Sequence, residues 1–203
     1  MNSAGSNHHA LPVVSLSVQP EAFFDYSHGI YVAGRAYDVW RYNNPGVHPA
    51  GSEFANYRVR GAESEREAHF EYFEKDGQSA VVQQNIGVRI HGGLSRKYNI
   101  KSLRLYARSE YGNSTFEYPF FHEKGLSTYK RLILRNSGND HNLTHMRDAA
   151  LQTLVSHLCF DTQAYQPTVV YINGEYWGIH NLRERFDKFY LSEKYGVGSD
   201  NID

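Results

Sequence analysis

The sequence predicts an α+β fold, mainly an antiparallel sheet made of local hairpins and packed with two helices. Two stretches of alternating apolar and polar residues flank strong turn signals: residues 86–108 around Gly92-Gly93, and residues 168–182 around Asn173-Gly174. Two other stretches, residues 144–158 and 184–195, carry apolar residues at helical spacing. Strands and helices mixed in this order, with strands joined locally, are typical of α+β proteins.

The composition limits the class of protein. The chain has 203 residues, a net charge of −1 and 40% hydrophobic residues, which together indicate an ordered globular protein. The balanced charge argues against bulk electrostatic binding to nucleic acid, and no run of about 18 apolar residues predicts a membrane span. One cysteine, Cys159, excludes an internal disulfide and a cysteine-based zinc site. Because Cys159 lies in an apolar stretch, we expect a buried, inert thiol.

Residues 1–10 read as a disordered leader without the apolar centre of a signal peptide. Residues 11–80 are expected to form a β-rich segment that packs on the remainder. Within it the pattern predicts strands at 11–18 and 67–74, and a turn into a short helix at 20–24. Residues 25–34 read as a turn and a short strand, and residues 35–61 as a long surface loop.

The hairpin at residues 86–108 is the most distinctive stretch. No acidic residue lies between Asp76 and Glu110, whereas basic side chains are frequent there: Arg89, Arg96, Lys97, Lys101, Arg104 and Arg108. Such a segment around a glycine turn is a candidate cradle for an anion. The alternative is a hairpin whose charges simply face water. Alternation places Lys101 on the apolar side of its strand, where a lysine either extends to the edge or points into a cleft.

The second half of the chain supplies the remaining elements. A strand is predicted at residues 129–136, and a helix of about four turns follows, capped by Thr144. Its expected buried face includes Met146, Leu154 and Leu158. The last helix is predicted at residues 184–195, with Phe186, Phe189 and Tyr190 inward and Gly196 as the C-cap.

Other polar residues give weaker signals. Arg147 and Asp148 open a predicted helix, where paired charges are more often structural than functional. Asp187 is expected to be a helix-dipole partner. His141 and His145 are four residues apart, but a glycine break precedes them and no third ligand has a fixed spacing, so a metal site is disfavoured. The common nucleotide, metalloprotease and hydrolase motifs are absent from the sequence.

A set of segments in order resembles the CotH family, the spore-coat-protein-H-like atypical protein kinases. The matching segments are GVRIHGGLSR (87–96), KSLRLYAR (101–108), LILRNSGND (132–140), MRDAALQ (146–152) and VVYINGEYWGIHNLRERFDKFYL (169–191). Each segment alone is unspecific, whereas the ordered set covers residues 86–195.

The resemblance implies a kinase-like small lobe over residues 81–203, with ATP and Mg²⁺ as the cofactors of the parent protein. Lys101 would meet the nucleotide phosphates, with Gly92, Gly93 and Ser95 in the turn over them. Glu184 would lie where the chain crosses toward a second lobe. The resemblance also assigns supporting roles to hairpin and helix residues: Arg89, Arg96, Arg147 and Asp148.

Members of the family continue into a second lobe that carries the catalytic and metal-binding residues. No residue here matches those positions, so no catalytic residue is assigned. We therefore expect an N-terminal fragment of a secreted or cell-surface CotH-like kinase of protein substrates. We expect it to be inactive alone and prone to self-association through surface meant for the missing lobe.

The alternative function is a non-catalytic surface or spore-coat module that binds carbohydrate or protein. A flat exposed patch of aromatic residues would favour this alternative: Tyr31, Tyr37, Trp40 and Tyr42.

Overall fold

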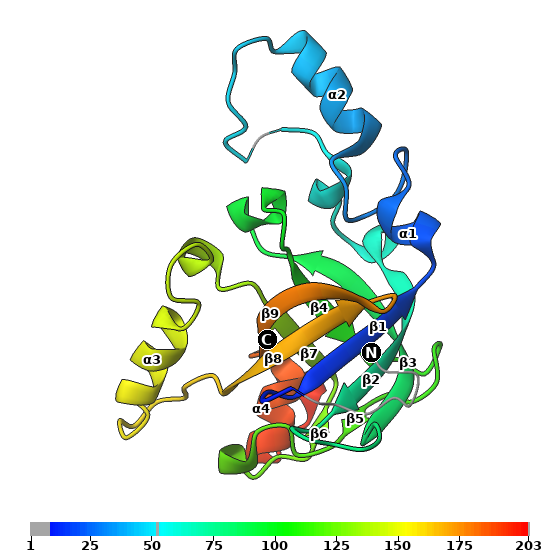
Figure 1. The fold of residues 1–203 in the computed structure, drawn as a ribbon. Helices are drawn as coiled ribbons and strands as arrows, with labels where there is room; N and C mark the ends of the chain where they lie inside the picture. The colour runs from blue at the N-terminus through cyan, green and yellow to red at the C-terminus, as the bar shows by residue number, and fades with distance from the viewer. Residues whose placement is uncertain (1–8, 52, 203) are drawn as a thin grey trace.

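A computed structural model describes residues 9–51 and 53–202, and seven strands of these residues close into a barrel (Figure 1). Around the barrel the order is β1, β2, β3, β4, β7, β9 and β8. Their bounds are Val13–Val18 for β1, Arg66–Phe73 for β2, Val82–His91 for β3, Ser102–Tyr106 for β4, Arg131–Arg135 for β7, Glu175–Glu184 for β9 and Tyr165–Ile172 for β8. The expected α+β, kinase-like small lobe is therefore wrong, because the sheet closes on itself.

Strand β1 causes the closure. It pairs antiparallel with β2, where Val13 lies opposite Phe73, and parallel with β8, where Val13 lies opposite Val169. All other neighbouring strands in the barrel are antiparallel. The parallel pairing joins segments about 150 residues apart, so no turn motif in the sequence predicts it. With β1 in place neither β2 nor β8 is left as an open edge.

The barrel interior is an apolar core. Alternate residues of each strand point inward, and leucines of three adjacent strands are fully buried: Leu103, Leu105, Leu132, Leu134 and Leu182. Aromatic rings from the connecting segments extend this core, among them Phe116, Phe120 and Phe121. The side chains that lie between these inward positions form the outer face of the sheet.

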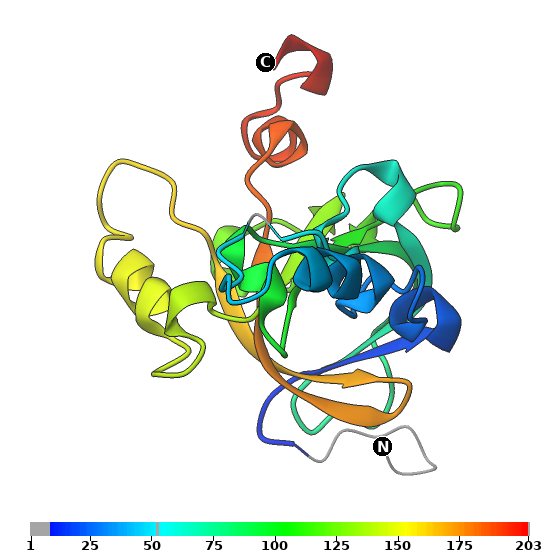
Figure 2. The same ribbon diagram turned by 90° about the horizontal axis from the view of Figure 1, so that it is seen from above.

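The helices lie outside the barrel. Helix α1 is Pro20–Phe24, α2 is Gly34–Asn43, α3 is Arg147–Leu154 and α4 is Lys188–Tyr195. Helix α2 projects away from the barrel, and α3 stands at its side (Figure 1). Seen from above, α4 and the C-terminal end extend from the barrel in a different direction from α3 (Figure 2). No helix of the described ranges is long and apolar enough to cross a membrane.

Short elements complete the fold. Strands β5 (Phe116–Glu117) and β6 (Thr128–Tyr129) form a separate two-stranded sheet. Six single turns of 3₁₀ helix lie in the connections: η1 (Asn56–Arg58), η2 (Ala62–Ser64), η3 (Leu94–Lys97), η4 (His122–Lys124), η5 (Gly138–Asp140) and η6 (Ser199–Asn201).

Several predicted elements are confirmed. Strands β1 and β2 and helix α1 fall where the sequence places them, and the two predicted hairpins are β3–β4 and β8–β9. Asn173 and Gly174 have φ angles of 51° and 81°, as a type I′ turn requires. Gly196 closes α4 with a left-handed φ of 67°.

The first corrections concern the segment before β2. No strand forms in residues 25–34, and α2 occupies part of the predicted loop at 35–61. Of the expected leader at 1–10, residues 1–8 lie outside the described residues. The proposed aromatic patch is wrong for Tyr31, which is buried; its hydroxyl accepts a hydrogen bond from the indole of Trp177 at 2.7 Å.

Further corrections concern α3 and α4. Helix α3 has eight residues rather than about four turns, and Thr144 does not cap it: the N-cap is Met146. The predicted face also included Ala149 and Ala150, and of its residues only Ala149 is buried; Met146, Leu154 and Leu158 are exposed. Cys159 follows the helix and is exposed, contrary to expectation. Phe186 is also exposed, whereas Tyr190 is buried as predicted.

Candidate functional site

Arginines of four adjacent strands meet on the outer face of the barrel. Arg89 of β3 pairs with Arg104 of β4, Arg104 with Ile133 of β7, and Ile133 with Arg183 of β9. Residues paired across strands share a face of the sheet, so this row lies opposite the leucine core. Two residues further along β7, Arg135 lies on the same face. We call Arg89, Arg104, Arg135 and Arg183 the arginine face.

Arg104 lies at the centre of the arginine face. Its Nη2 donates to Nδ1 of His91 at 2.7 Å, and its Nη1 donates to the hydroxyl of Tyr106 at 3.2 Å. Its Nε is buried and has no hydrogen-bond partner among the described residues. No ion pair joins Arg104 to a carboxylate in the same ranges. A buried N–H without an acceptor is costly, so the structure holds an unused donor here.

His91 does not compensate this charge. Burial lowers its pKa to about 4, and Arg104 and three further arginines lower it as well: Arg185, Arg96 and Arg135. At neutral pH the imidazole is therefore uncharged, and its Nδ1 can accept from Arg104. The centre of the face thus keeps a net positive charge.

Carboxylates neutralise the edges of the face instead. Glu65, which the sequence places outside the acid-free stretch, pairs with Arg89 at 2.6 Å and with Arg108 at 2.8 Å. Asp187 pairs with Arg131 at 2.9 Å and with Arg185 at 3.4 Å. The predicted basic hairpin is therefore partly paired, and on the arginine face the charge without a carboxylate partner is that of Arg104.

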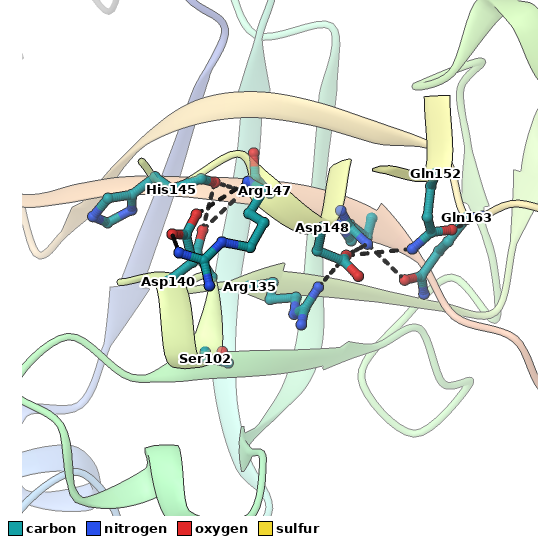
Figure 3. A network of polar contacts seen from close by, with 12 residues as sticks. Ser102, Arg135, Asp140, His145, Arg147, Asp148, Gln152 and Gln163 are labelled. Carbon is teal, nitrogen blue, oxygen red and sulfur yellow. Dashed lines mark hydrogen bonds and ion pairs between the residues drawn. The ribbon is translucent and has the colours of Figure 1, made fainter. Parts of the chain in front are cut away.

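Asp148 of α3 neutralises the β7–β9 side of the face (Figure 3). Its Oδ2 accepts from Arg135 and lies 2.5 Å from Nη1 of Arg183. Arg183 also donates to Oε1 of Gln163 at 3.0 Å, and Gln152 donates to Asp148 at 3.3 Å. Only Ala149 of α3 is buried, so this polar network is the main attachment of the helix to the barrel.

The turn after β3 is held by arginines from outside it. Arg96 donates from Nε to the Gly92 carbonyl at 2.8 Å, and Arg58 donates from Nη1 to the Gly93 carbonyl at 2.7 Å. Gly92 has a φ of 112°, and a Cβ there would lie 2.5 Å from the Ser95 hydroxyl oxygen. The backbone conformation at Gly92 therefore favours glycine, and a Cβ there would also displace the Ser95 hydroxyl. Arg96, whose guanidinium bonds only carbonyl oxygens among the described residues, has a structural role.

Lys101 lies on the opposite face of β4 from Arg104. It is 4% exposed, and its Nζ donates to the Tyr98 carbonyl at 2.6 Å. The ammonium lies 4.5 Å from the ring centre of Tyr57 and 5.2 Å from that of Tyr31. Burial, with a further contribution from Arg58, lowers the pKa of Lys101 to about 8. Its contacts tie together three segments that precede β4.

Glu184 does not lie beside Lys101. It ends β9 opposite Leu132 of β7, which in turn lies opposite Leu105 of β4. Four residues of an extended strand separate Leu105 from Lys101, roughly 13 Å. The structure therefore brings Lys101 near the glycine turn, since Arg58 acts on both, but it leaves Glu184 apart.

Arg147 lies at the start of α3, half-exposed and 3.4 Å from Asp140. The Thr144 hydroxyl and the Arg147 backbone N–H lower the pKa of Asp140 to about 2. Asp140 thus replaces the expected Thr144 cap by accepting from backbone N–H groups before α3 (Figure 3). Within the described ranges, no three His, Cys, Asp or Glu side chains form a candidate metal site.

Sequence reasoning placed Arg104 on the charged side of the hairpin but gave it no role, and it missed Arg135 and Arg183. Their signal was present: in RLILR (131–135) arginines flank an apolar core, and Arg183 alternates with Leu182. Only the register of β4, β7 and β9 shows that these positions share a face.

The family comparison agrees with the resemblance found in the sequence. The family model described as CotH kinase protein matches residues 88–202, more than half of the chain. A search of curated proteins found no match. The matched range contains β4, β7 and β9 with the end of β3 that carries Arg89, and therefore the whole arginine face.

Proposed function

The chain belongs to the CotH kinase protein family, and on that premise we propose that it binds the phosphates of a nucleotide on the arginine face. The reaction served would be phosphoryl transfer from ATP to a protein. The observation that carries the proposal is the buried, unpartnered Nε of Arg104 in a centre without a carboxylate.

Phosphoryl transfer depends mainly on positioning and on fixed positive charge around the phosphate oxygens. Arginine suits this task because its planar donors match phosphate geometry, and such bonds are charge-assisted. His91 and Tyr106 hold two donors of Arg104 in place, so the third is oriented before a ligand arrives. A pre-oriented donor loses little conformational entropy on binding.

The expectation that Lys101, Gly92, Gly93, Ser95 and Glu184 bind the nucleotide stays a proposal. The glycine turn directly follows His91, whose Nδ1 accepts from Arg104 across the two strands. Lys101 and Arg104, however, face opposite sides of β4, and the two assignments predict different binding-defective variants.

Magnesium does not fit the described residues, which hold no group of three or more candidate ligands, and we derive no step through it. ATP would supply the transferable phosphoryl group, and the arginine face would bind and orient its phosphates. A protein substrate, and a location at a cell or spore surface, are further proposals that rest on the family alone.

Isothermal titration of ATP, at low salt and with magnesium chloride present, tests this proposal. We expect the wild-type protein to bind and Arg104→Ala to bind roughly 10- to 100-fold more weakly, as for the loss of one charge-assisted hydrogen bond. Lys75→Gln is the matched control, since it removes one exposed positive charge from the turn after β2. It should leave the affinity within about twofold.

Equal affinities of Arg104→Ala and wild type would contradict the proposed phosphate site. If Lys101→Met alone abolished binding, the lysine assignment would replace it. Circular dichroism of each variant separates loss of binding from loss of fold.

A further inference from the structure

A cavity of about 350 Å³ lies between the end of the barrel and helix α4. Its walls come from β6, the start of β7, the end of β9 and α4. The cavity is also bordered by Arg131 and Arg185, at the edge of the outer face. Glu184 points to the inner side of β9, whereas its neighbour Arg183 points to the outer side. Its volume is in the range of small-molecule sites. We call it the Glu184 cavity.

Glu184 is fully buried and only half satisfied. Its Oε1 accepts from the Ala164 N–H at 2.8 Å, whereas its Oε2 is buried and has no hydrogen-bond partner among the described residues. The closest cation, Nζ of Lys124, lies 3.9 Å from Oε1 and donates instead to the Thr162 carbonyl. A buried carboxylate oxygen without a donor costs free energy that a bound donor group would recover.

The polar groups near Glu184 are already engaged. The Tyr129 hydroxyl donates to the Leu126 carbonyl at 2.9 Å, and the Tyr190 hydroxyl lies 3.4 Å from Asp161. Lys194 pairs with the same Asp161. None of these donors is directed at Oε2, so a donor group bound inside the cavity would satisfy it.

The remaining lining combines aromatic rings with charges of both signs: Lys130, Arg131 and Arg185 are basic, and Asp187 and Glu193 are acidic. The rings of Tyr129, Phe189 and Tyr190 and the side chain of Leu126 line the cavity, and Glu193 adds a carboxylate to the lining. Aromatic rings attract ammonium groups through their negative faces, and they pack against hydrocarbon. An ammonium group at Oε2 would also neutralise the buried charge of Glu184.

We propose that the Glu184 cavity binds a small organic amine, whose ammonium group donates to Oε2 of Glu184 while its apolar body packs on Tyr129 and Tyr190. The acceptor Glu184 is distinct from the donor Arg104 of the proposed phosphate site, because the two face opposite sides of the sheet, and only Arg131 and Arg185 at the edge of the outer face also border the cavity. It would stand even if the chain did not bind ATP.

Paired ligands test the proposal on the wild-type protein. The probes are 2-phenylethylamine and 2-phenylethanol, which have the same shape but differ in the charged donor. At pH 7 we expect titration calorimetry to show binding of the amine at least roughly tenfold tighter than that of the alcohol, and NMR shifts at Tyr129 and Tyr190. Equal affinities, or shifts elsewhere on the protein, would overturn the proposal.

Variants sharpen the test. Glu184→Gln keeps the shape of the side chain and removes its charge, so it should lower amine affinity at least roughly tenfold. Glu175→Gln, which removes an exposed carboxylate at the start of β9 and outside the cavity, is the matched control and should change it less than threefold. If Glu184→Gln bound the amine as tightly as wild type, Oε2 would not be the acceptor.

Competition with ATP separates this site from a nucleotide site. We expect saturating ATP to leave amine affinity unchanged. Displacement of the amine by ATP would assign Glu184 to the nucleotide site and overturn the separate cavity. A crystal structure soaked with the amine that showed only a water at Oε2 would also overturn the proposal.

Discussion

Lys101 directly precedes β4 and Arg104 lies in its middle, only three residues later, yet their surroundings differ completely. Lys101 is buried between two tyrosine rings, and its ammonium bonds a backbone carbonyl. Arg104, on the other side of the strand, contacts a neutral histidine and keeps a buried donor without a partner. The donors of the lysine are engaged by the structure around it, whereas the arginine keeps one donor without a partner among the described residues.

The face of the strand on which a basic side chain lies therefore determines its role. An inward lysine at the end of the barrel is enclosed by aromatic rings from the segments before β2 and by the turn before β4. An outward arginine meets other arginines, because the strands β3, β4, β7 and β9 each carry one at neighbouring positions. Stability and binding should therefore respond separately to changes at the two residues.

The largest expected effect is on stability at Lys101. Lys101→Ala removes the stem packed between Tyr31 and Tyr57 together with the cation–ring contacts, and we expect it to lower the free energy of unfolding by about 2–4 kcal/mol. Urea unfolding followed by tryptophan fluorescence measures it. Arg104→Ala should change the same quantity by less than about 1 kcal/mol, since no carboxylate loses a partner. Equal losses of unfolding free energy in the two variants would show that Lys101 and Arg104 contribute equally to stability.

A smaller effect is expected at Asp148. Asp148→Asn leaves Arg183, which is 1% exposed, without its counter-charge, but Asp148 itself is 42% exposed and partly screened by water. We therefore expect a loss of about 1–2 kcal/mol. Hydrogen exchange should accelerate in α3 first, because the helix is held mainly by this network. Exchange that accelerated uniformly across the barrel would contradict this attachment.

A further effect concerns pH. The pKa of Lys101 is about 8 in the folded protein, where the side chain is buried, and 10.5 when it is exposed to water. Between pH 8 and pH 10.5 the unfolded chain therefore binds more protons than the folded protein. Stability therefore gains a contribution that rises with pH from about 8 to 10.5. The measurement is the difference in unfolding free energy between wild type and Lys101→Met across this window. A difference that stayed constant would show that Lys101 titrates normally.

Local pairings of the barrel could be predicted from the sequence, but its closure could not. The Asn173-Gly174 hairpin and the strand at 66–73 follow from alternation and turn chemistry. The pairing of β1 with β8 involves no turn and no spacing rule, so a closed barrel was read as an open sheet. Helix α2 was missed because Asn43-Asn44-Pro45-Gly46 at its end dominated the interpretation of that segment.

The candidate site could be predicted only in part. Alternation correctly placed Lys101 with Leu103 and Leu105 on the apolar side. It could not show that Glu65, outside the hairpin, would neutralise Arg89 and Arg108, or that β7 would bring Arg135 beside β4. Those relations depend on strand register between distant segments, which composition and periodicity do not contain.

The most direct measurement is NMR of the arginine Nε–Hε groups during an ATP titration. We expect the Hε resonance of Arg104 to move downfield as its free donor meets a phosphate, while that of Arg96, already bonded to the Gly92 carbonyl, stays in place. If the Arg104 resonance did not respond while saturating ATP shifted the Lys101 ammonium resonance, the phosphate site at Arg104 would be wrong. The phosphates would then lie on the other side of β4.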